Sequence, residues 1–138
     1  MHAIDTSVLF YALDPRSTAK REAALRMVGT ASGLALPWQA LCELANGFRK
    51  LERLGVPRKE ARLFLDNLQH RHPVLFPRLE ALDLALDIEE RFSISFWDAN
   101  LVAACVVGGA EILYSEDIAC ALEIHGLKLV NPFAASRR

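Results

Sequence analysis

Long hydrophobic runs are missing from this sequence of 138 residues, although 52% of its residues are hydrophobic. A membrane-spanning helix needs about 20 consecutive apolar residues, and a secretory signal needs a basic segment ahead of an apolar one. The first apolar stretch has no such basic segment, and Asp5 interrupts it. We therefore expect no membrane contact and a cytoplasmic location.

An excess of positive charge is also missing, because 16 basic residues face 17 acidic ones and the formal net charge is −1. The chain as a whole therefore does not attract nucleic acid, and any such affinity must come from a local basic patch. Basic residues between positions 49 and 71 are candidates for gripping an RNA backbone, or they are simply the solvated face of two helices. The patch comprises Arg49, Lys50, Arg53, Arg58, Lys59, Arg62 and Arg71.

Cysteine and histidine are scarce. The three cysteines, Cys42, Cys105 and Cys120, have the spacing of neither a disulfide framework nor a zinc site, which indicates a reducing compartment. The four histidines are scattered without metal-ligand spacing, and we interpret them as surface or turn residues. If the chain binds a cation, the sequence therefore favours one with oxygen ligands rather than zinc.

Short apolar segments alternate with helical patterns along the whole chain, without a linker or an internal repeat. This alternation predicts a single α/β domain over residues 1–138, with a parallel sheet covered on both faces by helices. The expected strands are 2–4, 33–36, 74–76, 111–114 and 127–130. The expected helices are 6–13, 17–30 with Ser17 as N-cap, 37–54, 57–70, 77–91, 97–107 and 118–125.

Four acidic residues lie inside or against apolar runs. Asp5 and Asp117 each follow an expected strand, Asp98 begins an expected helix, and Glu43 lies within one. Ligands of parallel sheets bind beyond the carboxyl ends of the strands, and buried carboxylates are costly unless their charge is compensated. Because Mg²⁺ and Mn²⁺ prefer carboxylate oxygens, the four positions predict one such metal site at a sheet edge.

Each acid also has an ordinary structural explanation. Asp5 is a possible helix N-cap, Asp98 has capping-box spacing from Ser95, and Asp117 suits a turn or a cap. Glu43 is the hardest to explain as a solvated residue, because it lies near the apolar stripe of its helix. Asn46 lies one turn after Glu43, and this amide and the Ser115 hydroxyl are expected to orient metal ligands or substrate.

The segments IDTSVLFYALD (4–14), CELANGFRKL (42–51), SFWDANLVAAC (95–105), ILYSED (112–117) and VNPF (130–133) together resemble a PIN-domain ribonuclease. More narrowly, they resemble the toxin of a VapBC toxin–antitoxin pair. The resemblance implies a PIN-like three-layer fold with a short parallel central sheet flanked by helices. It also implies an endoribonuclease dependent on Mg²⁺ or Mn²⁺ that leaves a 5′-phosphate and a 3′-hydroxyl. Motif by motif, the metal-binding catalytic residues are Asp5, Glu43, Asp98 and Asp117, with Thr6 or Ser7, Ser115 and Glu116 as supports.

The same resemblance implies a cognate VapB-type antitoxin, which would insert a basic side chain into the acidic cleft, and a homodimer. Phe64 and Leu68 are candidate exposed contacts for either partner, or they are simply part of the core. Asn100 and the segment 118–121 depart from many relatives, which affects substrate assignment rather than the four acids. The alternatives are a catalytically silent PIN-like domain that binds RNA or protein, and a solitary RNA-processing nuclease. A haloacid-type phosphatase is disfavoured, because Ser7 stands where that family has a second Asp.

Overall fold

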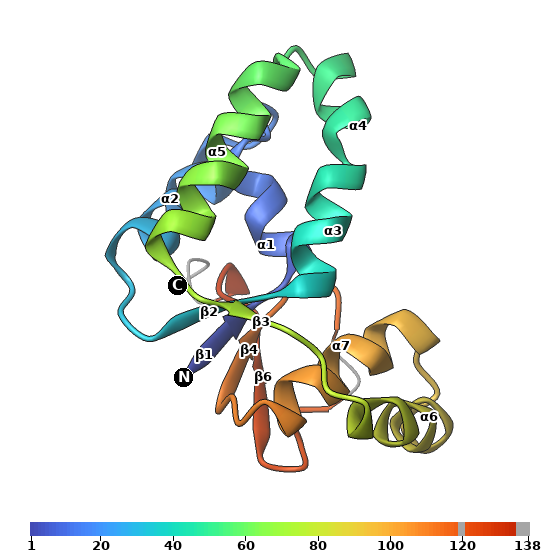
Figure 1. Cartoon of the computed structure of the whole chain (residues 1–138). Helices are drawn as coiled ribbons and strands as arrows, with labels where there is room; N and C mark the ends of the chain where they lie inside the picture. The colour runs from blue at the N-terminus through green and yellow to red at the C-terminus, as the bar shows by residue number, and fades with distance from the viewer. Residues whose placement is uncertain (119–120, 135–138) are drawn as a thin grey trace.

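The computed structural model describes residues 1–118 and 121–134, in which six strands form one sheet in the order β3-β2-β1-β4-β6-β5. All neighbouring strands are parallel except β5 and β6. The sheet occupies the middle of the molecule (Figure 1). The strands are β1 (His2–Ile4), β2 (Leu34–Pro37), β3 (Val74–Leu75), β4 (Ile112–Tyr114), β5 (Glu123–Ile124) and β6 (Leu127–Val130).

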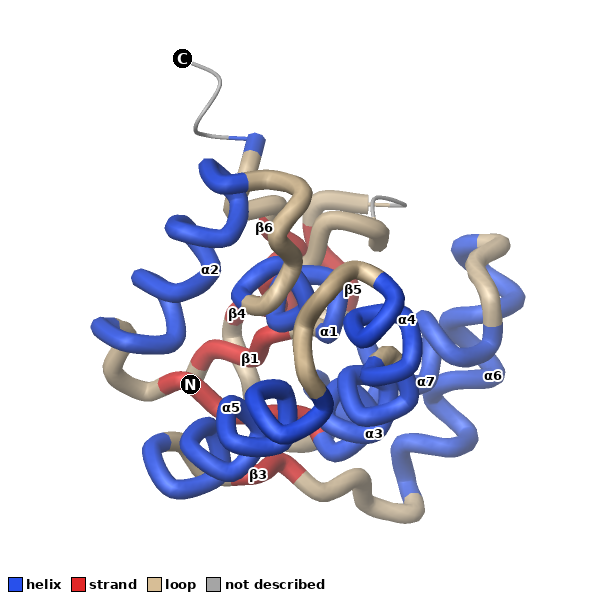
Figure 2. Tube along the Cα trace, turned by 90° about the horizontal axis from the view of Figure 1, so that it is seen from above, coloured by secondary structure: helices blue, strands red, loops and turns tan. Residues whose placement is uncertain are grey.

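Helices cover both faces of this sheet, as expected for a PIN-like α/β fold. One set, from α1 to α5, packs on one side, and α6 with α7 packs on the other (Figure 1). Seen from above, α2 and α6 lie at opposite flanks of the strands (Figure 2). The helices are α1 (Thr6–Leu9), the 3-10 turn η1 (Phe10–Ala12), α2 (Thr18–Thr30), α3 (Trp38–Asn46), α4 (Phe48–Arg53), α5 (Arg58–Arg71), α6 (Glu80–Phe92) and α7 (Phe96–Val107).

Strand β1 connects the two halves of the core. Ala3 and Ile4 are both fully buried, but Ala3 packs in the cluster under α6 and α7 while Ile4 packs in the cluster under α1 to α5. This follows from the period of two in a strand, which sends successive side chains to opposite faces. The backbone N–H of Asp5 continues the ladder by donating to the carbonyl of Tyr114 at 2.9 Å. Asp5 therefore stands at the carboxyl end of the central strand.

Three expected elements differ from the structure. The helix expected over 37–54 is divided at Gly47, where α3 approaches the ring of Phe10 so closely that a Cβ would lie 3.2 Å from it. Helix α6 begins at Glu80 rather than at Pro77. The helix expected over 6–13 is helical only to Leu9 and then tightens into η1.

The helix expected over 118–125 is wrong for its last residues, and its positions 119–120 lie outside the described residues. Glu123 and Ile124 instead form β5, which pairs antiparallel with β6. The two residues between these strands, His125 and Gly126, have φ of 49° and 84°. Two successive positive φ values suit the tight turn of a two-residue hairpin, which the sequence reading did not recognise.

Side-chain environments correct two further expectations. Leu68 is buried and Phe64 packs against the same core, so neither is an exposed contact. His72 is buried rather than on the surface, with Nε2 2.8 Å from the carbonyl oxygen of Val28. Of the cysteines, Cys42 is exposed, Cys105 is buried and both are free, while Cys120 is outside the described residues. Within residues 1–118 and 121–134, no helix has both the length and the apolarity to cross a bilayer.

The sheet core should be sensitive to truncation. Leu36 in β2 is fully buried between neighbouring strands, whereas Leu63, on α5, is 60% exposed. We expect Leu36→Ala to lower the free energy of unfolding by about 2–5 kcal/mol, because it leaves a cavity. Leu63→Ala, the matched control, should change it by less than about 0.5 kcal/mol. Urea unfolding followed by circular dichroism measures both, and equal effects would contradict the assigned core.

Candidate functional site

Asp5 is a buried carboxylate at the junction of β1 and α1, with 5% of its surface exposed. Its Oδ1 accepts the backbone N–H of Thr6 at 2.6 Å, and its Oδ2 accepts the hydroxyls of Ser115 at 2.8 Å and Ser7 at 3.3 Å. Asp5 is therefore the N-cap of α1 and is also held by the neighbouring strand end. Burial raises the pKa of Asp5 to about 6 against the lowering effect of these hydrogen bonds, and repulsion from Glu43 adds to the rise.

Glu43 projects from α3 as an exposed residue, and its Oε1 accepts the amide of Gln39 at 3.2 Å. Gln39 also donates to the carbonyl of Trp97 at 2.8 Å and accepts the amide of Asn100 at 2.9 Å. This network joins α3 to the start of α7, where Asp98 lies. Sequence reading missed Gln39 and treated Asn100 only as a departure from relatives, because nothing local shows that these two helices meet.

Asp98 and Asp117 complete the acidic group. The backbone N–H of Asp98 donates to the Ser95 hydroxyl at 3.1 Å, as the capping spacing predicted. Partial burial raises the pKa of Asp117, and so does repulsion from Glu116 and Asp98. The pKa of Glu43 is raised by partial burial and then by repulsion from Asp98 and Asp117. Repulsion of this kind decays with distance, and it links Glu43 to Asp5, Asp98 and Asp117, as expected if the four acids lie near one sheet edge.

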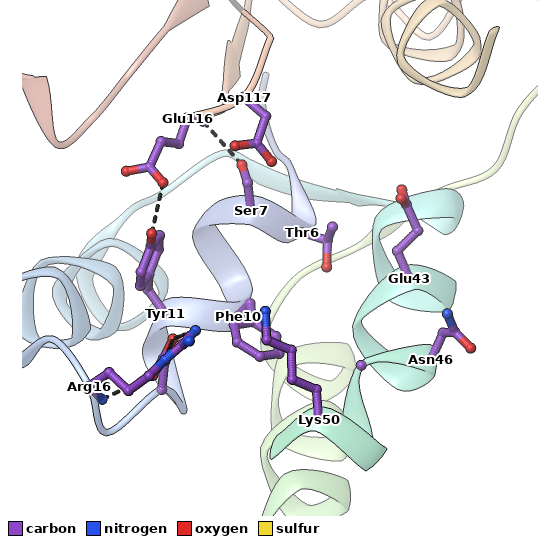
Figure 3. Close-up of a pocket in the computed structure, with 12 residues that line it drawn as sticks. Thr6, Ser7, Phe10, Tyr11, Arg16, Glu43, Asn46, Lys50, Glu116 and Asp117 are labelled. Carbon is purple, nitrogen blue, oxygen red and sulfur yellow. Dashed lines mark hydrogen bonds and ion pairs between the residues drawn. The ribbon is translucent and has the colours of Figure 1, made fainter. Parts of the chain in front are cut away.

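Glu116 has a different environment from its neighbour Asp117. Its carboxylate accepts the hydroxyl of Tyr11 at 2.8 Å and pairs with Lys20 at 2.6 Å, while its backbone N–H donates to Ser7 at 3.0 Å. Figure 3 shows Glu116 turned toward Tyr11, with Asp117 beside Ser7. Glu116 thereby anchors the loop that carries Asp117. No local pattern links Tyr11 or Lys20 to this loop, because both are distant from it along the chain.

A cleft of about 350 Å³ is lined by two of the four expected acids, Glu43 and Asp117, and by Glu116. Its upper part is formed by side chains of the acidic group and its expected supports (Figure 3). Asp5 and Ser115 are almost fully buried and, like Asp98, do not line the cleft. The residues of the upper part are Thr6, Ser7, Glu43, Asn46, Glu116 and Asp117.

The donor chemistry of this group fits a hard divalent cation. Its candidate ligands are carboxylate and hydroxyl oxygens, and their mutual repulsion is what a bound cation relieves. Among residues 1–118 and 121–134, no group of three or more His, Cys, Asp and Glu side chains is arranged to hold a metal ion. Asp5 is held by hydrogen bonds, whereas the Glu43 and Asp117 side chains are exposed, so metal binding would require these two side chains to turn toward Asp5.

The expected basic patch is divided in the structure. Lys50 lines the cleft beside the acids. Arg58 instead pairs with Glu52 at 3.2 Å and lies over the ring of Phe48, and with Arg62 it borders a separate cavity. Of the patch residues, Lys50 is therefore the one placed against the candidate site.

A sequence model of the PIN domain matches residues 3–122. The chain belongs to the PIN domain family. The family match supports a nuclease at the general level for this PIN domain. No curated protein shows significant sequence similarity to it.

Solved structures confirm the fold of this PIN domain. VapBC2 from Rickettsia felis, bound to a promoter DNA fragment, matches with a TM-score of 0.69 at 16% identity, over 94% of this chain and 97% of that chain. A toxin–antitoxin complex from Klebsiella pneumoniae matches with a TM-score of 0.71 at 14% identity, over 96% and 98%. VapC20 of Mycobacterium tuberculosis, a sarcin–ricin-loop-cleaving toxin, matches with a TM-score of 0.65 at 17% identity, over 87% and 92%.

The raised pKa of Asp5 predicts that its charge destabilises the metal-free fold. Because the folded pKa of about 6 exceeds the ordinary aspartate value of 3.8, the stability present below pH 3.8 is lost as pH rises through 6. At pH 7–8, Asp5→Asn should therefore have a free energy of unfolding higher than that of the parent protein by up to about 3 kcal/mol, and should unfold at higher urea. The gain should disappear by about pH 4. Urea titrations from pH 4 to 8 in EDTA measure this.

Asp14→Asn is the control of opposite sign. Asp14 is buried, and hydrogen bonds from Arg16 lower its pKa. Ionised Asp14 therefore adds stability above its unfolded pKa, and that stability is lost as pH falls through the folded value. Asp14→Asn should destabilise the protein at pH 7. A loss of stability in both variants at pH 7–8 would contradict the assignment for Asp5.

Proposed function

We propose that this PIN domain is an endoribonuclease dependent on Mg²⁺ or Mn²⁺. The observation that carries the proposal is an open cleft lined by Glu43 and Asp117, whose pKa values are raised by partial burial and by repulsion from Asp98. A metal bound there would screen the phosphodiester charge and lower the pKa of an attacking water. The four carboxylates would otherwise repel the same phosphate.

The residues have distinct roles in this proposal. Asp5 and Asp98 are direct metal ligands, and Asp5 is already oriented by its hydrogen bonds to Thr6 and Ser115. Glu43 and Asp117 complete the site directly or through water. The remaining supports position these groups or the substrate, and no covalent nucleophile is required. These supports are Thr6, Ser7, Asn46, Ser115 and Glu116.

We further propose that the nuclease is the toxin of a toxin–antitoxin pair with a VapB-type antitoxin. The fold shared with structures named as VapBC and toxin–antitoxin complexes supports this role. A small neighbouring reading frame encoding a DNA-binding antitoxin would support it further, and co-purification of the two products tests it. A solitary RNA-processing nuclease is the alternative if no such partner exists.

A variant of Asp98 tests the nuclease against a catalytically silent RNA-binding domain. Asp98→Asn keeps the shape and the helix-start backbone but removes a proposed metal ligand. We expect Mg²⁺-dependent cleavage of single-stranded RNA to fall at least about 100-fold, as losses of electrostatic catalytic groups do, while the thermal melt stays cooperative. Asp87→Asn, on the exposed face of α6, is the matched control and should cleave normally. Full activity in folded Asp98→Asn would overturn the metal site.

An exposed apolar surface supports the proposed homodimer. Phe76 stacks on Trp38 with ring centroids 5.5 Å apart, and Phe76, Leu79 and Trp97 are 62%, 84% and 64% exposed. Contiguous apolar patches on soluble domains often mark protein contacts. We expect Phe76→Glu with Leu79→Glu to convert a dimer to a monomer in sedimentation equilibrium. Leu63→Glu, on the 60% exposed Leu63 of α5, should leave it dimeric; a monomeric parent protein would contradict the proposal.

A further inference from the structure

The cleft has a second end with the opposite chemistry. Below the carboxylates its walls carry Arg16, from the turn before α2, and Lys50, from α4 (Figure 3). Arg16 was not among the expected site residues, since it lies in a short turn without a motif. A cleft with an acidic end and a basic end suits a polyanion. One of its phosphates would bind a metal ion held by the carboxylates, and the next phosphate would bind the Arg16 and Lys50 side chains.

Hydrogen bonds to a buried acid, Asp14, hold the Arg16 side chain in place. Asp14 is 1% exposed, and its Oδ1 accepts both the backbone N–H of Arg16 at 2.9 Å and its Nε at 3.0 Å. Its Oδ2 accepts Nη2 at 2.8 Å. These side-chain bonds use two of the five guanidinium N–H groups. The other three have no protein acceptor among the described residues, so the outer edge of a fixed donor fork stays available.

Lys50 supplies the uncompensated charge. Its Nζ lies 5.3 Å from the centroid of the Phe10 ring, which lines the cleft. Within residues 1–118 and 121–134 it forms no ion pair, but its charge contributes to lowering the pKa of Asp14. The positive charge of Arg16 is balanced by Asp14, so this end of the cleft has a net charge set by Lys50. A fixed fork beside a free ammonium is a combination that recognises phosphate oxygens.

The competing interpretation is that Asp14 and Arg16 only close the turn between η1 and α2. That role explains the backbone bond to Asp14, but it does not explain why the fork opens into the same cleft as Lys50. We propose that Arg16 and Lys50 form a subsite for an RNA phosphate flanking the scissile one. This proposal rests on the proposed nuclease function and names the part of the chain that holds the substrate.

The test compares neighbouring lysine and arginine positions on one helix. Lys50→Ala removes the cleft charge, and Arg49→Ala removes an exposed charge that does not line the cleft. Binding of a fluorescent 12-nucleotide single-stranded RNA is measured against salt in the Asp98→Asn background. Each phosphate contact contributes about 0.7 to the slope of log affinity against log salt for single strands. We expect Lys50→Ala to reduce the slope by about that amount, and Arg49→Ala to leave it unchanged.

Arg16 is tested with variants that separate binding from folding. Arg16→Ala should weaken RNA binding about tenfold, the loss of one charged hydrogen bond. Arg16→Lys keeps the charge but not the fork, and should recover part of that affinity. Arg21→Ala, on the exposed side of α2, is the control. Thermal melts identify any variant that is unfolded. If Arg16→Ala is unfolded, the RNA affinity of folded Arg16→Lys is compared with that of Arg21→Ala, and equal affinities would contradict the role of Arg16.

Cleavage kinetics distinguish this subsite from the nuclease proposal itself. In a protein that cleaves RNA, Lys50→Ala should raise KM about tenfold with little change in kcat, because the subsite holds ground state and transition state alike. If the parent protein cleaves but Lys50→Ala and Arg49→Ala share one KM and one salt slope, the subsite is overturned and the nuclease stands. If the parent protein neither binds nor cleaves RNA, both proposals are overturned.

Discussion

The burial of one carboxylate, Asp5, is the constraint on which the site depends. The group lies at the end of the central strand, where its oxygens receive the Thr6 N–H and the Ser115 hydroxyl. Those bonds fasten the end of β1 to α1 and to the segment after β4. They compensate the lost hydration only partly, since the pKa of Asp5 still rises to about 6. The fold therefore retains an ionisable carboxylate whose charged form is destabilised by burial, as functional sites commonly do.

The rest of the acidic group is arranged around this fixed point by contacts between elements. Gln39 and Asn100 join α3 to α7, which brings Glu43 and Asp98 to the same region. The bonds of Glu116 to Tyr11 and Lys20 anchor the loop bearing Asp117. One end of the cleft is thus a set of mutually repelling carboxylates. A hard cation would offset that repulsion, and the Asp14–Arg16 pair with Lys50 gives the other end its complementary character.

Sequence reasoning predicted most elements for local reasons. The α2 N-cap at Ser17, the buried strands and the ends of α7 all depend on residues close together in the chain. It failed where a distant contact or an unrecognised turn governed the outcome. The division of the helix at Gly47 coincides with the close approach of Phe10, and β5 replaces a helix because His125 and Gly126 form a tight hairpin with β6.

Most strands and helices, and the places of Asp5 and Asp117 after strands, of Asp98 at a helix start and of Glu43 within a helix, were determined by the sequence alone, because periodicity and capping are local. Only the tertiary structure decided that Gln39 links Glu43 to the start of α7, and that Tyr11 and Lys20 hold Glu116. It also separated Lys50, which lines the cleft, from Arg58, which pairs with Glu52 elsewhere. Charge interactions act through space, so which charges meet depends on the packing of helices that are distant along the chain.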